Sequence, residues 1–192
     1  TVRSAPESSG FVAGQRVSAF TMMGGYAERA LALPDSVIPT PAALDDAEAV
    51  CLLGNYYTMY FALARRGRLL AGETVLVLGS AGGIGVAAIQ IAKAMGAKVV
   101  AMVHRVEAMD FVASVGADVV LPLTDGWREA ALAATDGRGV DLVVDPVGGD
   151  AFDDAIRVLA PEGRLLVLGF AAGQGIPSVK VNRLLLRNVS VV

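Results

Sequence analysis

The sequence predicts an α/β fold in which a parallel β-sheet is covered by helices on both faces. From residue 74 to residue 168, short strand-like segments alternate with longer helix-like segments, the pattern of successive βαβ units. The strand-like segments are apolar at nearly every position, as burial on two faces requires. A glycine-rich turn follows the first of them. We therefore expect a doubly wound parallel sheet.

The first forty residues show a different pattern. Short alternating segments over 11–20 and 25–33 predict a few β-strands, and three prolines between 34 and 41 mark a linker. A helix is expected over 44–64, with two aspartates in its first turn and two arginines at its end. This change of pattern predicts two domains, 1–40 and 41–192.

The remaining elements follow from the change between apolar runs and helical periodicity. Strands are expected at 74–78, 98–103, 118–121, 140–145 and 164–168, and helices at 84–95, 107–115, 127–135 and 151–159. Each pair of successive strands is separated by one helix, so the sequence predicts parallel neighbours joined by crossovers.

The composition leaves either a protein with a buried sheet or a membrane protein. Apolar residues make up 54% of the chain and charged residues 18%, which excludes a disordered chain. The longest uncharged run, 74–92, is long enough to span a bilayer, but its glycines favour a strand, a turn and a helix. No signal peptide precedes the first polar stretch. We therefore expect a soluble, cytoplasmic protein with no membrane partner.

Charge and metal-ligating residues limit the function classes further. With 16 basic and 19 acidic residues, the net charge of −3 predicts no nucleic-acid partner. Cys51 is the single cysteine and His104 the single histidine. An intrachain disulfide and a zinc site of three or four Cys and His ligands are therefore excluded, and we expect no metal.

The glycine turn joins the first strand of the sheet to the first helix and reads GSAGGIG over 79–85. A dinucleotide pyrophosphate needs a tight turn, a bare backbone and the free N–H groups of a helix N-terminus. In this context the turn predicts a Rossmann-type dinucleotide site that includes Ser80, Ala81, Gly82, Gly83, Ile84 and Gly85. The alternative is that the glycines only allow the helix to pack closely on the strand.

The G-x-x-G-x-x-G spacing also opens short-chain dehydrogenases, which pair a catalytic tyrosine with a lysine four residues later. The tyrosines here are Tyr26, Tyr56, Tyr57 and Tyr60, and the residues at that offset are Ala30, Tyr60, Phe61 and Ala64. No lysine is available to lower the pKa of a tyrosine, so the short-chain mechanism is excluded.

Several further segments, in one order along the chain, carry a resemblance to a known family. They are GQRV at 14–17, GGYAE at 24–28, NYYT at 55–58, GETVLV at 72–77, VDLVVD at 140–145 and GRLLVLGF at 163–170. With the glycine turn, they resemble the medium-chain dehydrogenase/reductase superfamily, and within it the zinc-independent, zeta-crystallin-like quinone oxidoreductases. The resemblance implies a Rossmann-type domain preceded by part of a GroES-like β catalytic domain.

The end of the second strand of the sheet predicts the cofactor. NAD-selective domains carry a carboxylate there, whereas this strand ends in His104 and Arg105, with no acid before Glu107. Arg105 can pair with a 2′-phosphate and His104 can donate a second hydrogen bond, so NADPH is expected. The alternative is that Arg105 is a solvated residue at the start of the next helix.

The nicotinamide end of the cofactor is expected beyond the last strands, near 145–149 and 169–171. The resemblance implies that Val147 and Phe170 line it, with Gly169 and Ala171 beside Phe170, and that Asn55 and Thr58 reach it from the long helix. Capping or back-bonding inside that helix is the alternative for the last two. Asp145 is expected to be a hydrogen-bonding residue at a strand end rather than a base.

The resemblance implies hydride transfer from the nicotinamide to a quinone or an α,β-unsaturated carbonyl, without zinc. A hydroxyl group would polarise the carbonyl. Tyr56 and Tyr57 are candidates, although aromatic residues at helical spacing more often belong to a core. No residue is assigned as catalytic. Two alternatives stay open, an enoyl reductase of lipid or polyketide synthesis and a non-catalytic NADPH-binding protein.

The last four residues, 189–192, continue an apolar strand pattern. A strand at the edge of a sheet carries unpaired backbone groups that can pair with a second copy. The sequence therefore predicts a homodimer formed through this edge, as in dimers of the family.

Overall fold

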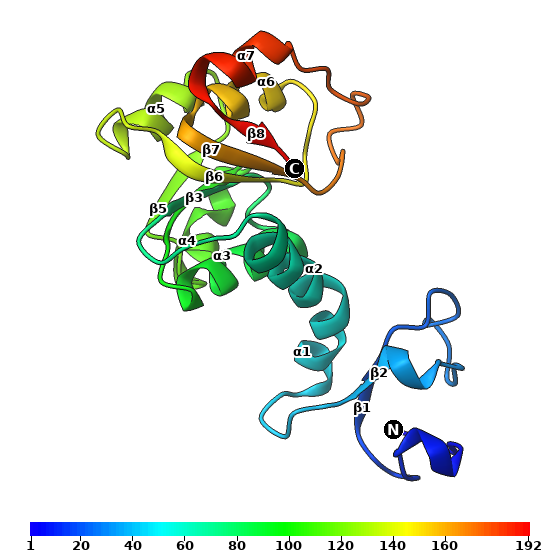
Figure 1. Ribbon diagram of the computed structural model, residues 1–192. Helices are drawn as coiled ribbons and strands as arrows, with labels where there is room; N and C mark the ends of the chain where they lie inside the picture. The colour runs from blue at the N-terminus through cyan, green and yellow to red at the C-terminus, as the bar shows by residue number, and fades with distance from the viewer. The chain divides into compact units, whose positions relative to one another are not determined.

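The computed structural model describes all residues from Thr1 to Val192 (Figure 1). Contacts within the chain divide it into two compact units, Thr1–Thr58 and Met59–Val192, called here the first and second unit. The division lies later in the chain than the change of sequence pattern near residue 40. The assignment of the first forty residues to a GroES-like domain stays a prediction.

The first unit contains one small antiparallel sheet. β1 (Val17–Ala19) pairs with β2 (Val37–Pro39), with Val17 opposite Pro39. A 3-10 helix, η1 (Glu7–Ser9), precedes β1, and a second one, η2 (Pro34–Ser36), leads directly into β2. The predicted strand over 25–33 is wrong. All of its residues are exposed and none pairs with another strand, so it gains neither burial nor ladder hydrogen bonds.

A run of helical segments begins with a capping box. The Asp45 carboxylate accepts from the Glu48 N–H at 2.8 Å, and the Glu48 carboxylate accepts from the Asp45 N–H at 3.0 Å. The segments are α1 (Asp46–Cys51), η3 (Leu52–Tyr56), α2 (Tyr57–Tyr60) and η4 (Phe61–Arg66). The helix predicted over 44–64 is therefore present, but η3 and η4 are π-helical and their hydrogen bonds close wider turns.

The second unit contains the predicted parallel sheet. Its strands are β3 (Thr74–Val77), β4 (Lys98–Val103), β5 (Val119–Pro122), β6 (Val140–Asp145), β7 (Leu159–Val167) and β8 (Ser190–Val191), and all neighbours pair in parallel. Their order is β5-β4-β3-β6-β7-β8. The chain runs outward from β3, returns to β6 and runs outward again, which confirms the doubly wound Rossmann order.

Helices connect the strands and cover both faces of the sheet. They are α3 (Gly83–Ala94), η5 (Val106–Ala108), α4 (Met109–Ser114), α5 (Trp127–Ala133), α6 (Ala151–Arg157) and α7 (Val181–Arg187). In Figure 1, α3 and α4 lie on one face, and α5, α6 and α7 lie on the other. The direction of the chain therefore reverses between β3 and β6, and the carboxyl ends of these two strands mark the switch point of the sheet.

Burial of the strands on both faces accounts for the apolar composition. All six residues of β6 are buried. On one face, Leu76 and Leu78 belong to a core cluster with Trp127 and Phe152 from α5 and α6. Val75, next to Leu76 in sequence, points to the opposite face and is also fully buried.

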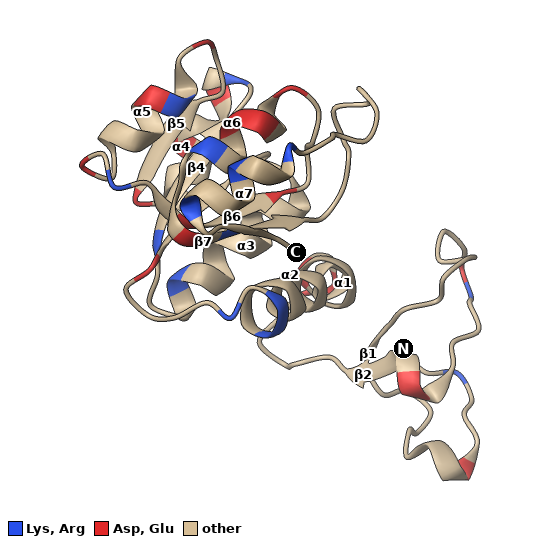
Figure 2. Ribbon diagram, turned by 45° about the horizontal axis from the view of Figure 1, so that its top comes forward, with Lys and Arg blue, Asp and Glu red and all other residues tan.

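No helix in the structure combines the length and the apolar character needed to cross a bilayer. Charged residues of both signs are interspersed on α5 and α6 (Figure 2). Arg128 Nη1 and Arg157 Nη1 each donate to Asp154 Oδ1 at 2.9 Å, and the first of these bonds links the two helices. Such partly exposed pairs contribute little to stability and mainly orient the side chains.

Candidate functional site

Four loops meet at the carboxyl edge of the sheet around the switch point. They follow β3, β4, β6 and β7, and because the strands are parallel, all four lie at one edge. The backbone N–H of Ser80 donates to the carbonyl of Met102 at 3.2 Å. A β-carbon on Gly79 would lie 3.2 Å from Cγ2 of Val147. The glycine turn therefore contacts both of its neighbours, the end of β4 and the loop after β6.

Within the turn, Gly85 and Gly82 differ in how closely neighbouring atoms approach them. A β-carbon on Gly85 would lie 2.4 Å from the carbonyl oxygen of Gly79 and 2.6 Å from Cα of Ser80, so Gly85 permits close packing of α3 on the turn. At Gly82 the nearest such atom is 3.5 Å away, an ordinary contact. Close packing therefore accounts for the glycine at position 85. It does not account for the glycine at position 82.

The serine of the turn is structural. Ser80 is fully buried, and its hydroxyl donates to the carbonyl of Val77 at 2.7 Å. That bond holds the turn on the end of β3. The hydroxyl points back to the strand, so a cofactor would meet the backbone of this residue.

The N-terminus of α3 has no side-chain cap. Its N-cap residue is Gly82, and the first intrahelical bond runs from the Val86 N–H to the Gly82 carbonyl at 2.9 Å. The N–H groups of the first turn, which includes Gly83 and the half-buried Ile84, lack a side-chain acceptor, and the positive end of a twelve-residue helix lies there. Ala81, Gly82 and Gly83 are exposed beside it. These residues fit the pyrophosphate of a dinucleotide.

The end of β4 presents two unpaired basic residues. His104 and Arg105 are exposed directly after Val103, and neither forms an ion pair or side-chain hydrogen bond. Arg105 is also the N-cap of η5, so it is indeed a solvated residue at the start of the next helix. That position leaves its guanidinium free for an anionic ligand.

Asp145, the last residue of β6, accepts hydrogen bonds from the loop that follows the strand. Its Oδ1 accepts from the N–H groups of Val147 at 2.9 Å and Gly148 at 2.8 Å, which confirms its role as a strand-end hydrogen-bonding residue. Oδ2 is buried without a partner. Burial raises the pKa of this carboxyl, and the two N–H groups oppose that shift only in part.

The raised pKa of Asp145 predicts a pH-dependent contribution to stability. The folded chain binds the proton more tightly than the unfolded chain, so the contribution is full at low pH and is lost as the pH rises. Relative to Asp145→Asn, which keeps an acceptor for both N–H groups, the wild type is expected to lose free energy of unfolding above pH 3.8, the ordinary value. Urea unfolding across a pH series checks this, and a pH-independent difference would contradict it.

The loop after β7 lies against the loop after β6. The N–H of Ala171 donates to the carbonyl of Pro146 at 3.1 Å, and the N–H of Ala172 donates to that of Val147 at 2.9 Å. Phe170 is 43% exposed, and Gly169 is half-buried against Pro146. The structure thus brings Val147 together with Gly169, Phe170 and Ala171, as the sequence predicts.

Asn55 and Thr58 lie in the first unit, on η3 and α2, and their part in the cofactor site stays a prediction. Thr58 Oγ1 donates to the carbonyl of Gly54 at 2.6 Å, which is the back-bonding alternative. Tyr57 is 58% exposed and does not belong to a core. Burial raises the pKa of Tyr56, with Cys51 and Glu48 adding to it, so this phenol holds its proton more tightly.

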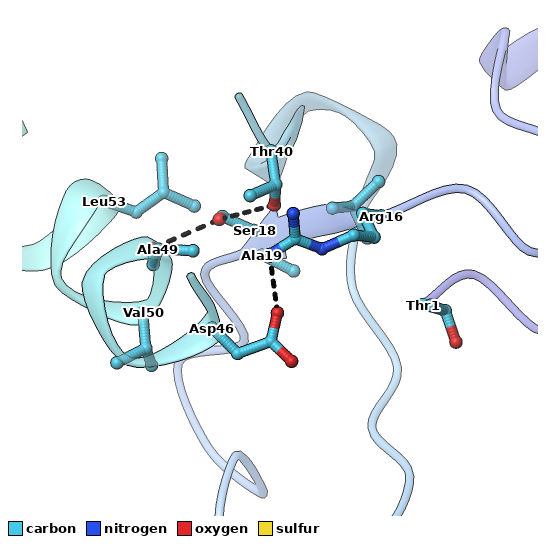
Figure 3. Close-up of a pocket in the computed structure, with 10 residues that line it drawn as sticks. Thr1, Arg16, Ser18, Ala19, Thr40, Asp46, Ala49, Val50 and Leu53 are labelled. Atoms are coloured by element: carbon cyan, nitrogen blue, oxygen red, sulfur yellow. Dashed lines mark hydrogen bonds and ion pairs between the residues drawn. The ribbon is translucent and has the colours of Figure 1, made fainter. Parts of the chain in front are cut away.

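A hollow of about 350 Å³ within the first unit was not predicted (Figure 3). Its polar groups are paired with one another: Arg16 Nη2 lies 2.7 Å from Asp46 Oδ1, and Ser18 Oγ lies 3.1 Å from Thr40 Oγ1 and from the Ala49 carbonyl. These bonds tie the small sheet to α1. Thr1 also lines the hollow.

The chain has no ligand set for zinc. No group of three or more His, Cys, Asp or Glu side chains could hold a metal ion, and Cys51 and His104 belong to different units. Zinc normally takes three or four such ligands in proteins. Cys51 and His104 therefore do not form a zinc site with each other.

Sequence reasoning missed two residues at the edge of the site, Gln174 and Asp150. The side chain of Gln174 forms two hydrogen bonds with Asp150, across the loops after β7 and β6. A glutamine in a glycine-rich loop and an aspartate before a helix are both common in solvated positions. Only the neighbouring pair Gly148 and Gly149, which indicates a close backbone approach, hints at the contact.

Comparison with known protein families and sequences finds a matching family model and many similar proteins. The family model described as zinc-binding dehydrogenase matches residues 83–192. Quinone oxidoreductase-like protein 2 of Bos taurus is 38% identical over 181 residues, which are 93% of this chain and 52% of that protein. A phenolphthiocerol/phthiocerol polyketide synthase polypeptide of Mycobacterium tuberculosis is 34% identical over 164 residues, 85% of this chain and 7% of that protein. The chain spans about half the length of the quinone oxidoreductase-like relative.

Solved structures of oxidoreductases also match the fold of this chain. A crystal structure described as a probable oxidoreductase from Mycobacterium abscessus has a TM-score of 0.87 and 65% identity, and the match covers 98% of this chain and 56% of that one. The quinone oxidoreductase of Thermus thermophilus, solved alone and with NADPH, has a TM-score of 0.81 and 36% identity, with 95% and 57% covered.

Proposed function

The chain belongs to the quinone oxidoreductase group of the medium-chain dehydrogenase/reductase superfamily, and from this premise we propose that it forms the cofactor-binding part of an NADPH-dependent oxidoreductase. The acceptor is a quinone or an α,β-unsaturated carbonyl, and the reaction proceeds without zinc. The observation that carries the proposal is the uncapped N-terminus of α3 behind a glycine turn at the switch point of the sheet.

Each loop at the carboxyl edge has a part in this proposal. Gly82 and Gly83 meet the pyrophosphate, Arg105 and His104 meet the 2′-phosphate, and Val147 and Phe170 flank the nicotinamide. The bound nicotinamide supplies a hydride to an electrophilic carbon of the acceptor. The chain's own residues orient the ring and keep water from one side of it. No catalytic proton donor is proposed among these residues.

The test is oxidation of NADPH by the full-length protein, followed by absorbance at the nicotinamide band. Three acceptor classes are offered in parallel: a simple quinone, a small enone and an enoyl thioester. Turnover with the quinone or the enone supports the proposal. Turnover with the thioester alone favours an enoyl reductase, the alternative that the polyketide synthase relative favours. NADPH binding without turnover of any acceptor indicates a non-catalytic binding protein.

The preference for NADPH depends on Arg105. Because the guanidinium is exposed and unpaired, it can form a charge-assisted bond with a 2′-phosphate at little cost. We expect Arg105→Ala to weaken NADPH binding about tenfold, equivalent to about 1.4 kcal/mol, and to leave NADH binding within about twofold. Isothermal titration with both cofactors measures this.

The matched control is Arg65→Ala, which removes an exposed arginine at the end of η4. It loses the same charge from the protein, so it separates a local contact from a general electrostatic effect. Equal losses for the two variants, or equal binding of NADH and NADPH by the wild type, would show that Arg105 does not select the cofactor.

The proposal includes a homodimer formed through β8. This strand pairs on one side only, with β7, and its other side carries unpaired backbone groups. On α7, the helix before it, Leu185 and Leu186 are 80% and 78% exposed. A second copy would cover these groups. Light scattering that gives a monomer at micromolar concentration would refute the dimer.

A cytoplasmic location, without nucleic-acid or membrane partners, is part of the same proposal and is tested by cell fractionation.

A further inference from the structure

The loops after β6 and β7 are joined by a side-chain bridge at the cofactor edge of the sheet. We propose that Gln174 and Asp150 form a clasp, and that this clasp is a positioning device that holds Phe170 and Val147 ready for the nicotinamide. The inference rests on the proposed function for the identity of the ligand. The clasp itself stands on contacts within the second unit.

The clasp consists of two reciprocal hydrogen bonds. The backbone N–H of Asp150 donates to Gln174 Oε1 at 2.9 Å, and Gln174 Nε2 donates to Asp150 Oδ2 at 3.0 Å. One amide side chain therefore satisfies both a backbone donor and a carboxylate on the other loop. An amide is the one side-chain group of this size that can donate and accept in parallel without changing its protonation state.

The backbone is shaped to admit the glutamine. Gly149 has a φ of +61°, and a β-carbon there would lie 2.1 Å from Gln174 Oε1 and 2.9 Å from Cβ of Ala172. Any other residue at position 149 would be strained and would also expel the glutamine side chain. The glycine is therefore part of the clasp.

The clasp acts on residues of the site through two backbone bonds. Between Phe170 and Gln174, the N–H groups of Ala171 and Ala172 donate to the carbonyls of Pro146 and Val147. A β-carbon on Gly148 would lie 3.1 Å from Cδ1 of Phe170, so the ring lies directly on the β6 loop. The bonds of Gln174 to Asp150 hold the far end of this loop against the loop after β6. They thereby keep Phe170 at a fixed distance from Val147.

Apart from the clasp and these two backbone bonds, few contacts hold the loop after β7 in place. Every residue from 170 to 176 is exposed, and both Gly173 and Gly175 have positive φ angles. Segments with few buried contacts open locally at low cost. If the loop must be closed for the cofactor to bind, the apparent Kd rises as the fraction of molecules with a closed loop falls.

The experiment exchanges the donor and acceptor of the clasp in the full-length protein. Gln174→Glu keeps an acceptor for the Asp150 N–H but places two carboxylates in contact. Asp150→Asn keeps an acceptor for Gln174. In the double variant, the new amide at position 150 donates to the new carboxylate at position 174, which restores both bonds. Asp110→Asn on α4, an exposed residue without a side-chain partner, is the control for loss of charge.

Two readouts separate the clasp from the proposed function. Hydrogen exchange of the Ala171 and Ala172 amides, without cofactor, is expected to be about fivefold faster in Gln174→Glu, the effect of one lost hydrogen bond, and close to the wild-type rate in the double variant. NADPH titration is expected to give the same order, with a Kd and a KM about fivefold higher in Gln174→Glu and kcat changed less than about twofold.

The outcomes are distinct. Unchanged exchange in Gln174→Glu, or no recovery in the double variant, would overturn the clasp even if NADPH binds. Faster exchange with an unchanged Kd for NADPH would overturn its positioning role. If neither the wild type nor any variant binds NADPH, the proposed function fails, and the exchange rates alone still decide whether the clasp exists.

Discussion

Gly85→Ala is expected to destabilise the protein by about 2–3 kcal/mol and to abolish most of its NADPH binding. The new β-carbon would lie 2.4 Å from the Gly79 carbonyl oxygen, with Cα and C of Ser80 at 2.6 and 2.7 Å. All three atoms are backbone, and Ser80 is held by its bonds to Val77 and Met102. The turn or α3 must therefore move. The better helix propensity of alanine, about 1 kcal/mol, offsets only part of this cost.

The informative comparison is Gly82→Ala, three residues earlier in the same turn. Gly82 has a φ of −85° and an ordinary 3.5 Å to its nearest neighbour, so alanine costs less than about 1 kcal/mol of stability as an N-cap. The methyl group would nonetheless occupy the space through which a pyrophosphate approaches the backbone. We expect about tenfold weaker NADPH binding with little change in melting temperature.

Thermal unfolding and NADPH titration of both variants distinguish packing from ligand approach. If Gly82→Ala bound NADPH as tightly as the wild type, the bare backbone would have no ligand role and only the packing interpretation would remain. If Gly85→Ala were as stable as the wild type, the close contact with Gly79 would not limit the packing of α3, and the packing interpretation of Gly85 would be wrong.

The sheet could be predicted from the sequence because each strand carries its own signal. A continuous apolar run such as β6 has to be buried on both faces, and the helix after each strand fixes the parallel direction. Strand boundaries were harder to predict for a physical reason. β7 begins at Leu159, well before the predicted start at 164, because Val140 pairs with Leu159 and a register shift follows before Leu142 pairs with Arg164. A bulge of that kind leaves no mark in hydrophobic periodicity.

The residues of the candidate site also differ in whether the local sequence predicts them. The glycine turn, Arg105 and the residues after β6 and β7 are encoded locally, because a strand end fixes where the next two or three residues lie. Gln174 and Asp150 meet across 24 residues of chain, and their pairing depends on how two loops fold back. The strand expected over 25–33 failed for the converse reason: alternation is a local signal, but a strand also needs a partner.

Arg164 provides the second large effect, at the amino edge of the sheet, opposite the loops that follow β3, β4, β6 and β7. Its guanidinium pairs with both oxygens of Glu73, at 2.8 and 2.7 Å, and Nε donates to the Gly67 carbonyl at 2.6 Å. It also donates to the carbonyls of Asp141 and Arg68 at 3.1 and 3.2 Å. The side chains of Arg164 and Glu73 are only 13% and 21% exposed. One residue thus ties β7, the start of β3 and the end of the helical run together.

We expect Arg164→Met to lower the free energy of unfolding by about 3 kcal/mol, because in a mostly buried place it removes the guanidinium from Glu73, whose carboxylate keeps only the Leu70 N–H as a donor. Lysine at this position would recover little, since one ammonium cannot reproduce the planar fork. Adding Glu73→Gln to Arg164→Met should restore part of the loss by removing the unpaired charge. Lys93→Met is the control: the side chains of its ion pair with Asp118 are 36% and 40% exposed, so its loss is expected to cost less than about 1 kcal/mol. Urea unfolding of the wild type and these variants measures the series. Equal costs for Lys93→Met and Arg164→Met would mean that burial and the forked geometry add nothing to the ion pair, and that this edge of the sheet is held by its apolar core alone.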